Sequence, residues 1–276
     1  MKLFLRLLCI ILFLASITAC NKFSKTLKNK DTDYQLVQAD EYFVKGKYRN
    51  AQQLYETLFP VFKGSQKFED LYYRYAYCFY YQKLYSDAEN LFKGFLETFP
   101  NSTKAEEIDF MRSFSFYKQS PKLELEQVNT IKAMNMMQSF INTHPGSKRI
   151  AEATEIIDKS RQKLEQKDAR AALLYYNLGQ FRAAAIAHAD LGNNYPESVL
   201  GDQYKLMVVK SYFRFAKLSY SNRQEERYNK VINEFEDFSD RFPESKLLKE
   251  AESYSNLSKI NIKALQNEQI TSSAKR

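Results

Sequence analysis

The side chains best suited to nucleophilic or metal chemistry are few in this sequence: three cysteines and two histidines. His144 and His188 stand far apart, and no cysteine lies at a metal-ligand spacing from either. No Gly-rich phosphate loop or activated-nucleophile motif is present. The carboxylate pairs Glu106-Glu107 and Glu225-Glu226 fall on polar helix faces and are predicted to be solvated charge. We therefore predict a protein that is not an enzyme, with no catalytic residue, no metal site and no cofactor.

Cys20 has a different chemical context, because it follows a short apolar segment at the N-terminus. Two basic residues precede the apolar run from Leu7 to Leu14, which is too short to span a bilayer. The run is followed by Ser16-Ile17-Thr18-Ala19-Cys20, which resembles the bacterial lipoprotein signal. The resemblance implies that residues 1–19 are a signal peptide, that cleavage precedes Cys20, and that acyl chains such as palmitate modify its thiol and its new amine.

The segment after the signal is expected to be a flexible tether, residues 20–31, that carries the lipid. Its lysines would attract anionic lipid headgroups: Lys22, Lys25, Lys28 and Lys30. The formal net charge of +8 is spread without a strong block, and we expect no nucleic-acid partner for an exported lipoprotein. Cys78 then has no partner for an internal disulfide, and its aromatic surroundings predict a buried thiol.

The elements that position these residues are predicted from four recurring corners in a chain with few helix breakers, 7 glycines and 6 prolines. In each corner a proline ends one helix, and a serine two residues later can cap the next. The corners are spaced by 45, 51 and 47 residues: Phe99-Pro100-Asn101-Ser102, His144-Pro145-Gly146-Ser147, Tyr195-Pro196-Glu197-Ser198 and Phe242-Pro243-Glu244-Ser245. Leu58-Phe59-Pro60 is a looser fifth copy.

Between the corners, the spacing of small and aromatic residues resembles the tetratricopeptide repeat. Small side chains at one position of each first helix would let paired helices approach closely: Ala39, Ala76, Ser113, Ala172 and Ser211. We therefore predict an all-α fold, a tetratricopeptide-repeat superhelical solenoid of about five helix pairs over residues 32–266. The third and fifth copies are longer, and we expect extended loops at about residues 118–127 and 219–225.

One more helix, within residues 245–266, is predicted to cap the solenoid, because the last repeat would otherwise expose its apolar side. Its predicted apolar face carries Leu248, Ala251, Leu257 and Ile260. Residues 267–276 are predicted to be a disordered tail.

The chain contains 20 tyrosines and 21 phenylalanines, and their densest run extends from Tyr72 to Tyr81. Two stripes at helical spacing stand out on the first helices of the second and third copies: Tyr73, Tyr77 and Tyr80, then Phe110, Phe114 and Tyr117. In tetratricopeptide domains such a stripe faces the peptide-binding groove, and we predict that role here, with Arg74 or Arg112 taking a ligand carboxylate. The alternative is that the rings only pack neighbouring helices together.

The lipid-site cysteine, the basic tether and the repeats together resemble the BamD family of outer-membrane β-barrel assembly lipoproteins. The resemblance is strongest over Tyr34–Pro100 and Leu164–Pro196, while the helix beyond Ser245 and the long fifth copy exceed the family pattern. It implies a non-enzymatic protein anchored in the outer membrane and facing the periplasm. Its expected partners are unfolded outer-membrane proteins at the N-terminal repeats, a BamA-type insertase at the C-terminal repeats, and other assembly lipoproteins.

Two other functions fit the same residues. A lipid-anchored tetratricopeptide scaffold that recruits cell-envelope enzymes would share both the repeats and the anchor. A glycan-binding lipoprotein would also use aromatic platforms, but such platforms usually contain tryptophan, and this chain has none.

Overall fold

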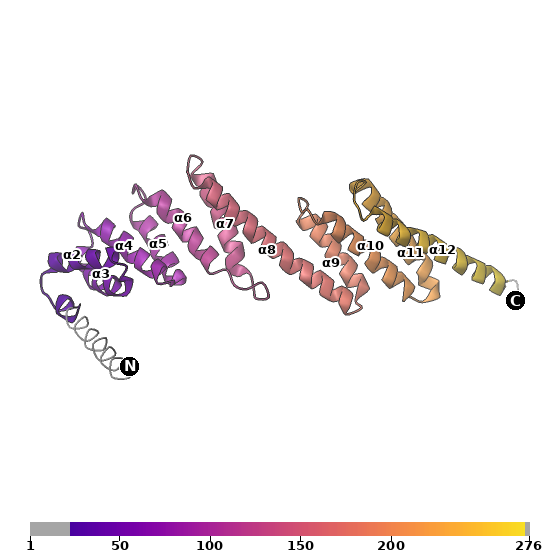
Figure 1. The fold of residues 1–276 in the computed structure, drawn as a ribbon, viewed down its shortest axis with the longest axis horizontal. Helices are drawn as coiled ribbons and strands as arrows, with labels where there is room; N and C mark the ends of the chain where they lie inside the picture. Colours follow the sequence, from indigo (N-terminus) through magenta and orange to yellow (C-terminus); the bar gives the residue numbers. More distant parts are fainter. Residues whose placement is uncertain (1–22, 274–276) are drawn as a thin grey trace, which may run out of the picture. The chain divides into compact units, whose positions relative to one another are not determined.

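The computed structural model describes residues 23–273, which are helical apart from short connections (Figure 1). Cys20 and the predicted signal peptide lie outside the described residues. The helices are α2 (Thr32–Val44), α3 (Tyr48–Phe62), α4 (Phe68–Tyr81), α5 (Tyr85–Thr98), α6 (Ala105–Lys118), α7 (Val128–Thr143), α8 (Ile150–Asn177), α9 (Phe181–Asn194), α10 (Gly201–Lys217), α11 (Ser221–Arg241) and α12 (Leu248–Ser273). These form five successive pairs, from α2–α3 to α10–α11, plus α12, and they confirm the predicted all-α tetratricopeptide-repeat fold. Between residues 23 and 273, no helix is both long and apolar enough to cross a membrane.

The chain divides into two compact units, Met1–Ser160 and Arg161–Arg276, with the division inside α8. The first unit has one large core built mainly from aromatic rings, including the fully buried Tyr55, Phe92 and Phe95. The second has smaller clusters, one around Leu191 and another around Phe238. Most of the aromatic side chains that the sequence analysis singled out therefore belong to the first unit.

The small residues predicted at the helix crossings are all fully buried: Ala39, Ala76, Ser113, Ala172 and Ser211. Small residues of the second helices are buried in the same way, for example Ala51, Ala88 and Ala184. A larger side chain at any of these positions would force the paired helices apart, because protein interiors are close-packed. The repeat pattern read from the sequence is thus the pattern that sets the helix contacts.

The turn inside three of the pairs is one recurring C-terminal cap. The second residue after the first helix has a positive φ at Gly46 (70°), Lys83 (63°) and Gly179 (75°). At each turn the backbone N–H groups close back on the helix, as in Leu84 N to Phe79 O at 3.0 Å and Lys83 N to Tyr80 O at 2.9 Å. Glycine suits this left-handed conformation, so Lys83 is the strained member of the set.

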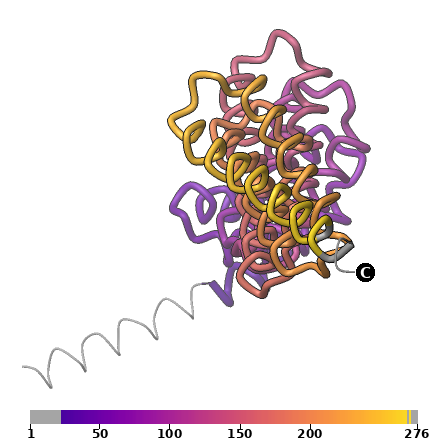
Figure 2. Tube along the Cα trace, turned by 90° about the vertical axis from the view of Figure 1, so that its right-hand side faces the viewer, coloured from indigo at the N-terminus to yellow at the C-terminus, as the bar shows by residue number. Residues whose placement is uncertain are grey.

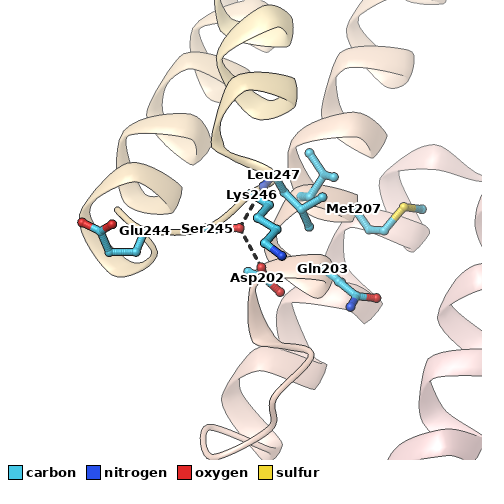
Figure 3. A pocket seen from close by; sticks show the side chains of 8 residues that line it. Asp202, Gln203, Met207, Glu244, Ser245, Lys246 and Leu247 are labelled. Carbon is cyan, nitrogen blue, oxygen red and sulfur yellow. Dashed lines mark hydrogen bonds between the residues drawn. The ribbon is translucent and has the colours of Figure 1, made fainter.

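The corners between pairs carry a linkage that extends the predicted serine role. In every corner the serine Oγ accepts a hydrogen bond from the backbone N–H two residues later, at 3.0–3.1 Å. The same hydroxyl donates to a carboxylate of the preceding repeat's first helix: Ser102 to Glu69, Ser147 to Glu106, Ser198 to Glu165 and Ser245 to Asp202. Figure 3 shows the last of these, beside a surface pocket of about 610 Å³. Each serine therefore joins the start of one repeat to the repeat before it.

Pro60 does not form a fifth corner, contrary to the prediction from Leu58-Phe59-Pro60. It lies inside α3, which continues to Phe62. The proline falls in the last turn of the helix, where its missing N–H removes one hydrogen bond without stopping the chain. The aromatic ring of Phe59 packs against Phe68 and Tyr72 of α4, both at 4.8 Å between ring centroids, and this contact holds the last turn in place.

The tether was predicted to be flexible as far as residue 31, but its described part is packed on α2. Residues 23–27 form a helical turn, and the Phe23 ring meets the Tyr42 ring at 5.6 Å. The buried amide of Gln35 donates to the carbonyls of Thr26, Leu27 and Asn29 at 3.2, 2.9 and 2.8 Å. Asp31 then caps α2 by accepting from Tyr34 N at 3.0 Å. The side chain of Gln35 thus holds in place a segment that was predicted from the sequence to be flexible.

The extra length of the third and fifth copies is accommodated in two ways. Residues 119–127 lie between α6 and α7, as predicted for the third copy. The fifth copy has only residues 218–220 between its helices, so the predicted loop at 219–225 is wrong. Its additional residues lengthen the helices, and α11 extends from Ser221 to Arg241.

The C-terminal helix α12 packs on α10 and α11, as expected for a cap, and Figure 2 shows α11 and α12 side by side in orange and yellow. Its buried face agrees with the predicted one only in part: Ala251 is fully buried as predicted, but so are Ser255 and Ser258, whereas Leu257 and Ile260 are exposed. The helix also continues to Ser273, into the segment predicted as a disordered tail. No glycine or proline occurs between Leu248 and Ser273 to end it.

Candidate functional site

Two tyrosines of α4 are held by one carboxylate of α6. The hydroxyls of Tyr73 and Tyr77 donate to Glu107 Oε1 at 3.0 and 2.5 Å, and the two rings lie 4.7 Å apart. Burial and the Glu107 carboxylate raise the pKa of Tyr73 to about 12 and raise that of Tyr77 further. Both hydroxyls therefore remain protonated donors at neutral pH.

This contact corrects the prediction that Glu106 and Glu107 are solvated charges. Glu107 joins the first helices of two successive repeats through the tyrosine hydroxyls, and Glu106 accepts from Ser147 at 2.5 Å. Both carboxylates accept hydrogen bonds from residues more than 25 positions away in the sequence. The spacing of residues within one helix does not reveal such long-range partners.

The predicted stripes of α4 and α6 adjoin one another. The Tyr80 ring of α4 lies 6.4 Å from the Phe114 ring of α6. Phe114 is stacked with both Phe110 and Tyr117, each at 5.8 Å. The Lys118 ammonium lies 4.7 Å from the centre of the Phe114 ring, a cation–π contact. The structure therefore brings the six predicted aromatic residues into one connected cluster.

The six rings differ in exposure, however, and two of them offer no open surface to a ligand. Phe110 is fully buried against Phe140, at 5.4 Å, and Tyr77 is 5% exposed. Tyr73, Tyr80, Phe114 and Tyr117 are half-buried. Phe110 and Tyr77 are thus core residues, which corrects the prediction that they contact a ligand directly.

Both arginines beside the cluster already hold carboxylates of this chain. Arg74 Nη1 lies 2.5 Å from Asp40 Oδ2, and Tyr55 donates to the other oxygen of the same carboxylate at 2.6 Å. Arg112 Nε lies 2.9 Å from Glu89 Oε1, and Glu89 is itself buried. These internal ion pairs compete with the predicted capture of a ligand carboxylate by either arginine.

Tyr81 is the aromatic residue of this surface that the sequence analysis missed. It is 46% exposed, more than any predicted member of the stripe, and lies next to Tyr77 at 5.6 Å and Tyr80 at 5.6 Å. Its ring also stacks on Tyr48 of the first repeat at 4.5 Å, so it extends the cluster towards α3. The signal was present in the sequence, because Tyr81 follows Tyr77 by one helical turn. We call the five accessible rings Tyr73, Tyr80, Tyr81, Phe114 and Tyr117 the aromatic surface.

The remaining reactive side chains occupy structural positions. Cys78 is fully buried in the first core, as predicted, and burial raises the pKa of its thiol. His188 is buried, with Nδ1 2.8 Å from the carbonyl oxygen of Ala184, while His144 lies 3.2 Å from Asp109. The described part of the chain holds no group of three or more His, Cys, Asp or Glu side chains arranged for a metal ion.

A family model for the YfiO outer membrane lipoproteins matches residues 28–216, which is more than half of the sequence. The chain belongs to this family. The YfiO, or BamD, proteins are non-catalytic outer-membrane lipoproteins of the assembly machinery, in agreement with the resemblance seen in the sequence. The match ends within α10, so α11 and α12 lie beyond the YfiO pattern.

Other comparisons add little to the YfiO assignment. No curated protein matches the sequence. Among solved structures, the TPR2AB domain of yeast Sti1, in a complex with pHSP90, is similar over 83% of this chain and 98% of its own length. The sequence identity is 12% and the TM-score 0.39.

Proposed function

We propose that the aromatic surface binds extended segments of unfolded outer-membrane barrel precursors. Membership of the YfiO family provides the context of barrel assembly, and the accessible rings provide the chemistry. A barrel strand alternates apolar and polar side chains, so an unfolded strand can lay its apolar side chains on such rings. The single observation that carries the proposal is the continuity of the rings from α4 to α6 through Tyr80 and Phe114.

The hydroxyls of the aromatic surface are uncharged and its rings pack against one another, which suits a binder of many different precursors. The raised pKa values of Tyr73 and Tyr80, both about 12, keep the hydroxyls uncharged. Neighbouring rings fix most of the side chains, so little conformational entropy is lost when a segment binds. Arg74 and Arg112 are left out of this proposal because Asp40 and Glu89 occupy them.

The remaining parts of the proposed function follow from the family. The protein is anchored through lipid on Cys20 and faces the periplasm, its C-terminal repeats contact a BamA-type insertase, and it associates with other assembly lipoproteins. Co-purification from detergent extracts tests these partners. Recovery of a large barrel protein supports the proposal, whereas recovery of peptidoglycan hydrolases without it would favour the scaffold function.

A direct test measures binding of a fluorescein-labelled peptide that copies the last strand of an outer-membrane barrel and ends in phenylalanine. The double variant Tyr80→Ala/Phe114→Ala removes the two rings that bridge α4 and α6. We expect its Kd to rise about tenfold or more, since loss of each buried aromatic contact costs about 1–2 kcal/mol.

Tyr220→Ala is the matched control, because Tyr220 is 87% exposed, lies in the other unit and has no ring partner in the described residues. Its Kd should equal that of the unmodified protein. Circular dichroism reports whether the helices persist in each variant. Equal peptide affinity for the folded double variant and the control would refute the aromatic surface as the binding site.

A further inference from the structure

A second candidate site lies wholly in the unit that starts at Arg161. Residues of α9, α10 and α11 line a pocket of about 470 Å³, within the range of about 300–1,000 Å³ that is usual for small-ligand sites. Arg182 comes from α9, Tyr212 and Phe215 from α10, and Arg227 from α11. The α11 wall lies beyond the residues that match the YfiO family, so the pocket is not a feature of the family pattern.

The charges around this pocket do not cancel. Lys230 is paired with Glu234 at 2.7 Å, and Glu226 with Arg223 at 3.2 Å. Arg182 and Arg227 have no carboxylate partner anywhere in residues 23–273. The pocket therefore presents two uncompensated guanidinium groups.

Arg227 is held in a fixed orientation by α10 and by the connection that follows it. Its guanidinium carbon lies 4.0 Å from the centre of the Phe215 ring, and Nη1 donates to the hydroxyl of Ser219. A guanidinium that stacks on a ring by its face keeps donors at its edge for a planar anion. A guanidinium held in this way loses little conformational entropy when it binds a carboxylate.

The other polar groups of the pocket are suited to a peptide backbone. Asn229 and Asn233 lie one helical turn apart on α11, and their amides have no hydrogen-bond partner in the described residues. The Tyr212 hydroxyl is likewise unpartnered there. An amide both donates and accepts, which matches a peptide group, whereas a phosphate ester only accepts at neutral pH. The rings of Tyr212 and Phe215 add apolar surface for a side chain.

We propose that this pocket binds an acidic peptide segment of a partner protein. Arg182 and Arg227 hold its carboxylates, Asn229 and Asn233 pair with its backbone, and Tyr212 contacts an apolar side chain beside them. The proposal rests on the proposed function only in that a protein partner reaches the C-terminal repeats. It does not depend on the aromatic surface of the first unit.

The test uses two fluorescein-labelled heptapeptides, one with two glutamates flanking a phenylalanine and the other with glutamines in their place. Fluorescence anisotropy with the purified full chain should show binding of the glutamate peptide and at least tenfold weaker binding of the glutamine peptide. Arg182→Gln and Arg227→Gln should each weaken the glutamate peptide about tenfold, as expected for loss of a charge-assisted hydrogen bond. Arg227→Lys keeps the charge but not the planar guanidinium, so its affinity for the glutamate peptide should lie between those of the unmodified protein and Arg227→Gln.

Arg49→Gln is the control, because Arg49 is exposed like Arg182, has no ion-pair partner in the described residues and lies in the other unit. Arg182 is exposed and makes no hydrogen bond, ion pair or ring contact within residues 23–273, so Arg182→Gln decides the outcome even if loss of the Arg227 stacking disturbs α11. The proposal is overturned if both peptides bind equally, if neither binds, or if Arg182→Gln binds the glutamate peptide as tightly as Arg49→Gln does. It is also overturned if phosphatidylglycerol vesicles, rather than the glutamate peptide, show the arginine-dependent binding.

The two proposals fail separately. The barrel-strand peptide should bind the Arg182→Gln variant with unchanged affinity, and the glutamate peptide should bind the Tyr80→Ala/Phe114→Ala variant with unchanged affinity. Loss of insertase co-purification alone, with both peptide results intact, would contradict the proposed partner and leave the acidic-peptide site standing.

Discussion

The hydroxyl of Tyr72 in α4 lies directly against the backbone of Gly94 in α5, where any Cβ atom would collide with it. Tyr72 is buried and its ring is fixed by Phe59 at 4.8 Å and by Phe95 at 5.8 Å. The ring therefore cannot swing away to make room. This contact sets how closely the two helices of the second repeat approach.

Gly94→Ala should therefore destabilise the protein, although alanine normally stabilises a helix interior by about 1 kcal/mol relative to glycine. Tyr72→Phe removes the colliding oxygen and leaves the ring carbon at 3.5 Å from the new Cβ, an ordinary contact. In that background Gly94→Ala should become stabilising by about 0.5–1 kcal/mol. Urea unfolding followed by circular dichroism measures both values, and a stabilising Gly94→Ala in the unmodified protein would contradict the steric account.

Ser211 and Ser113 occupy equivalent small positions, but only one hydroxyl is satisfied. Ser113 Oγ donates to the carbonyl oxygen of Asp109 at 3.0 Å, whereas the buried Ser211 Oγ has no partner among the described residues. Burying an unpaired hydroxyl costs about 1–3 kcal/mol. Ser211→Ala should consequently raise the free energy of unfolding by about 1 kcal/mol, and Ser113→Ala should leave it nearly unchanged. Equal effects of the two substitutions in urea unfolding would disprove this difference.

Lys83 adopts the left-handed conformation that Gly46 and Gly179 adopt at the equivalent turns. A residue with a Cβ is strained by about 1–2 kcal/mol in this conformation. Glycine avoids that strain, but it loses more backbone entropy on folding, which offsets part of the gain. Lys83→Gly should raise the free energy of unfolding by about 0.5–1 kcal/mol, and the melting temperature should rise with it. Gly179→Ala is the reverse control and should lower it, since no atom lies within 4 Å of the new Cβ and only the backbone strain changes.

His188 should make stability depend on pH. Burial lowers its pKa from 6.5, partly offset by the Ala184 carbonyl, so the unfolded chain takes up a proton more readily than the folded one. Stability is therefore full above pH 6.5 and falls as the pH drops below it. The melting temperature should decrease between pH 7.5 and pH 5.5, and His188→Gln should make that decrease smaller. An identical decrease in the variant would show that other groups control it.

The repeat positions were predictable because each depends on one local requirement, repeated along the chain. A crossing needs a small side chain, and a helix ends where Pro100 or Pro243 removes a donor. Pro60 shows the limit of that reasoning: near a helix end, ring packing by Phe59 outweighs the missing hydrogen bond.

The candidate site was predicted only in part, because helical spacing identifies a face without showing what covers it. Tyr77 and Phe114 have the same position in their stripes, yet the first is buried and the second half-open. Arg74 and Arg112 form ion pairs with carboxylates of other helices, and a single sequence gives no indication of those pairs. The same limit concealed the pocket at Arg227, whose walls come from three helices.

The packing of residues 23–31 on α2 changes how a lipid on Cys20 would act. Only Asn21 and Lys22 separate that cysteine from Phe23, whose ring lies on Tyr42. Three residue steps span at most about 11 Å when fully extended. A lipid on Cys20 would therefore be a short tether that keeps the first repeat next to the lipid headgroups, and a bound precursor would have to reach the membrane surface.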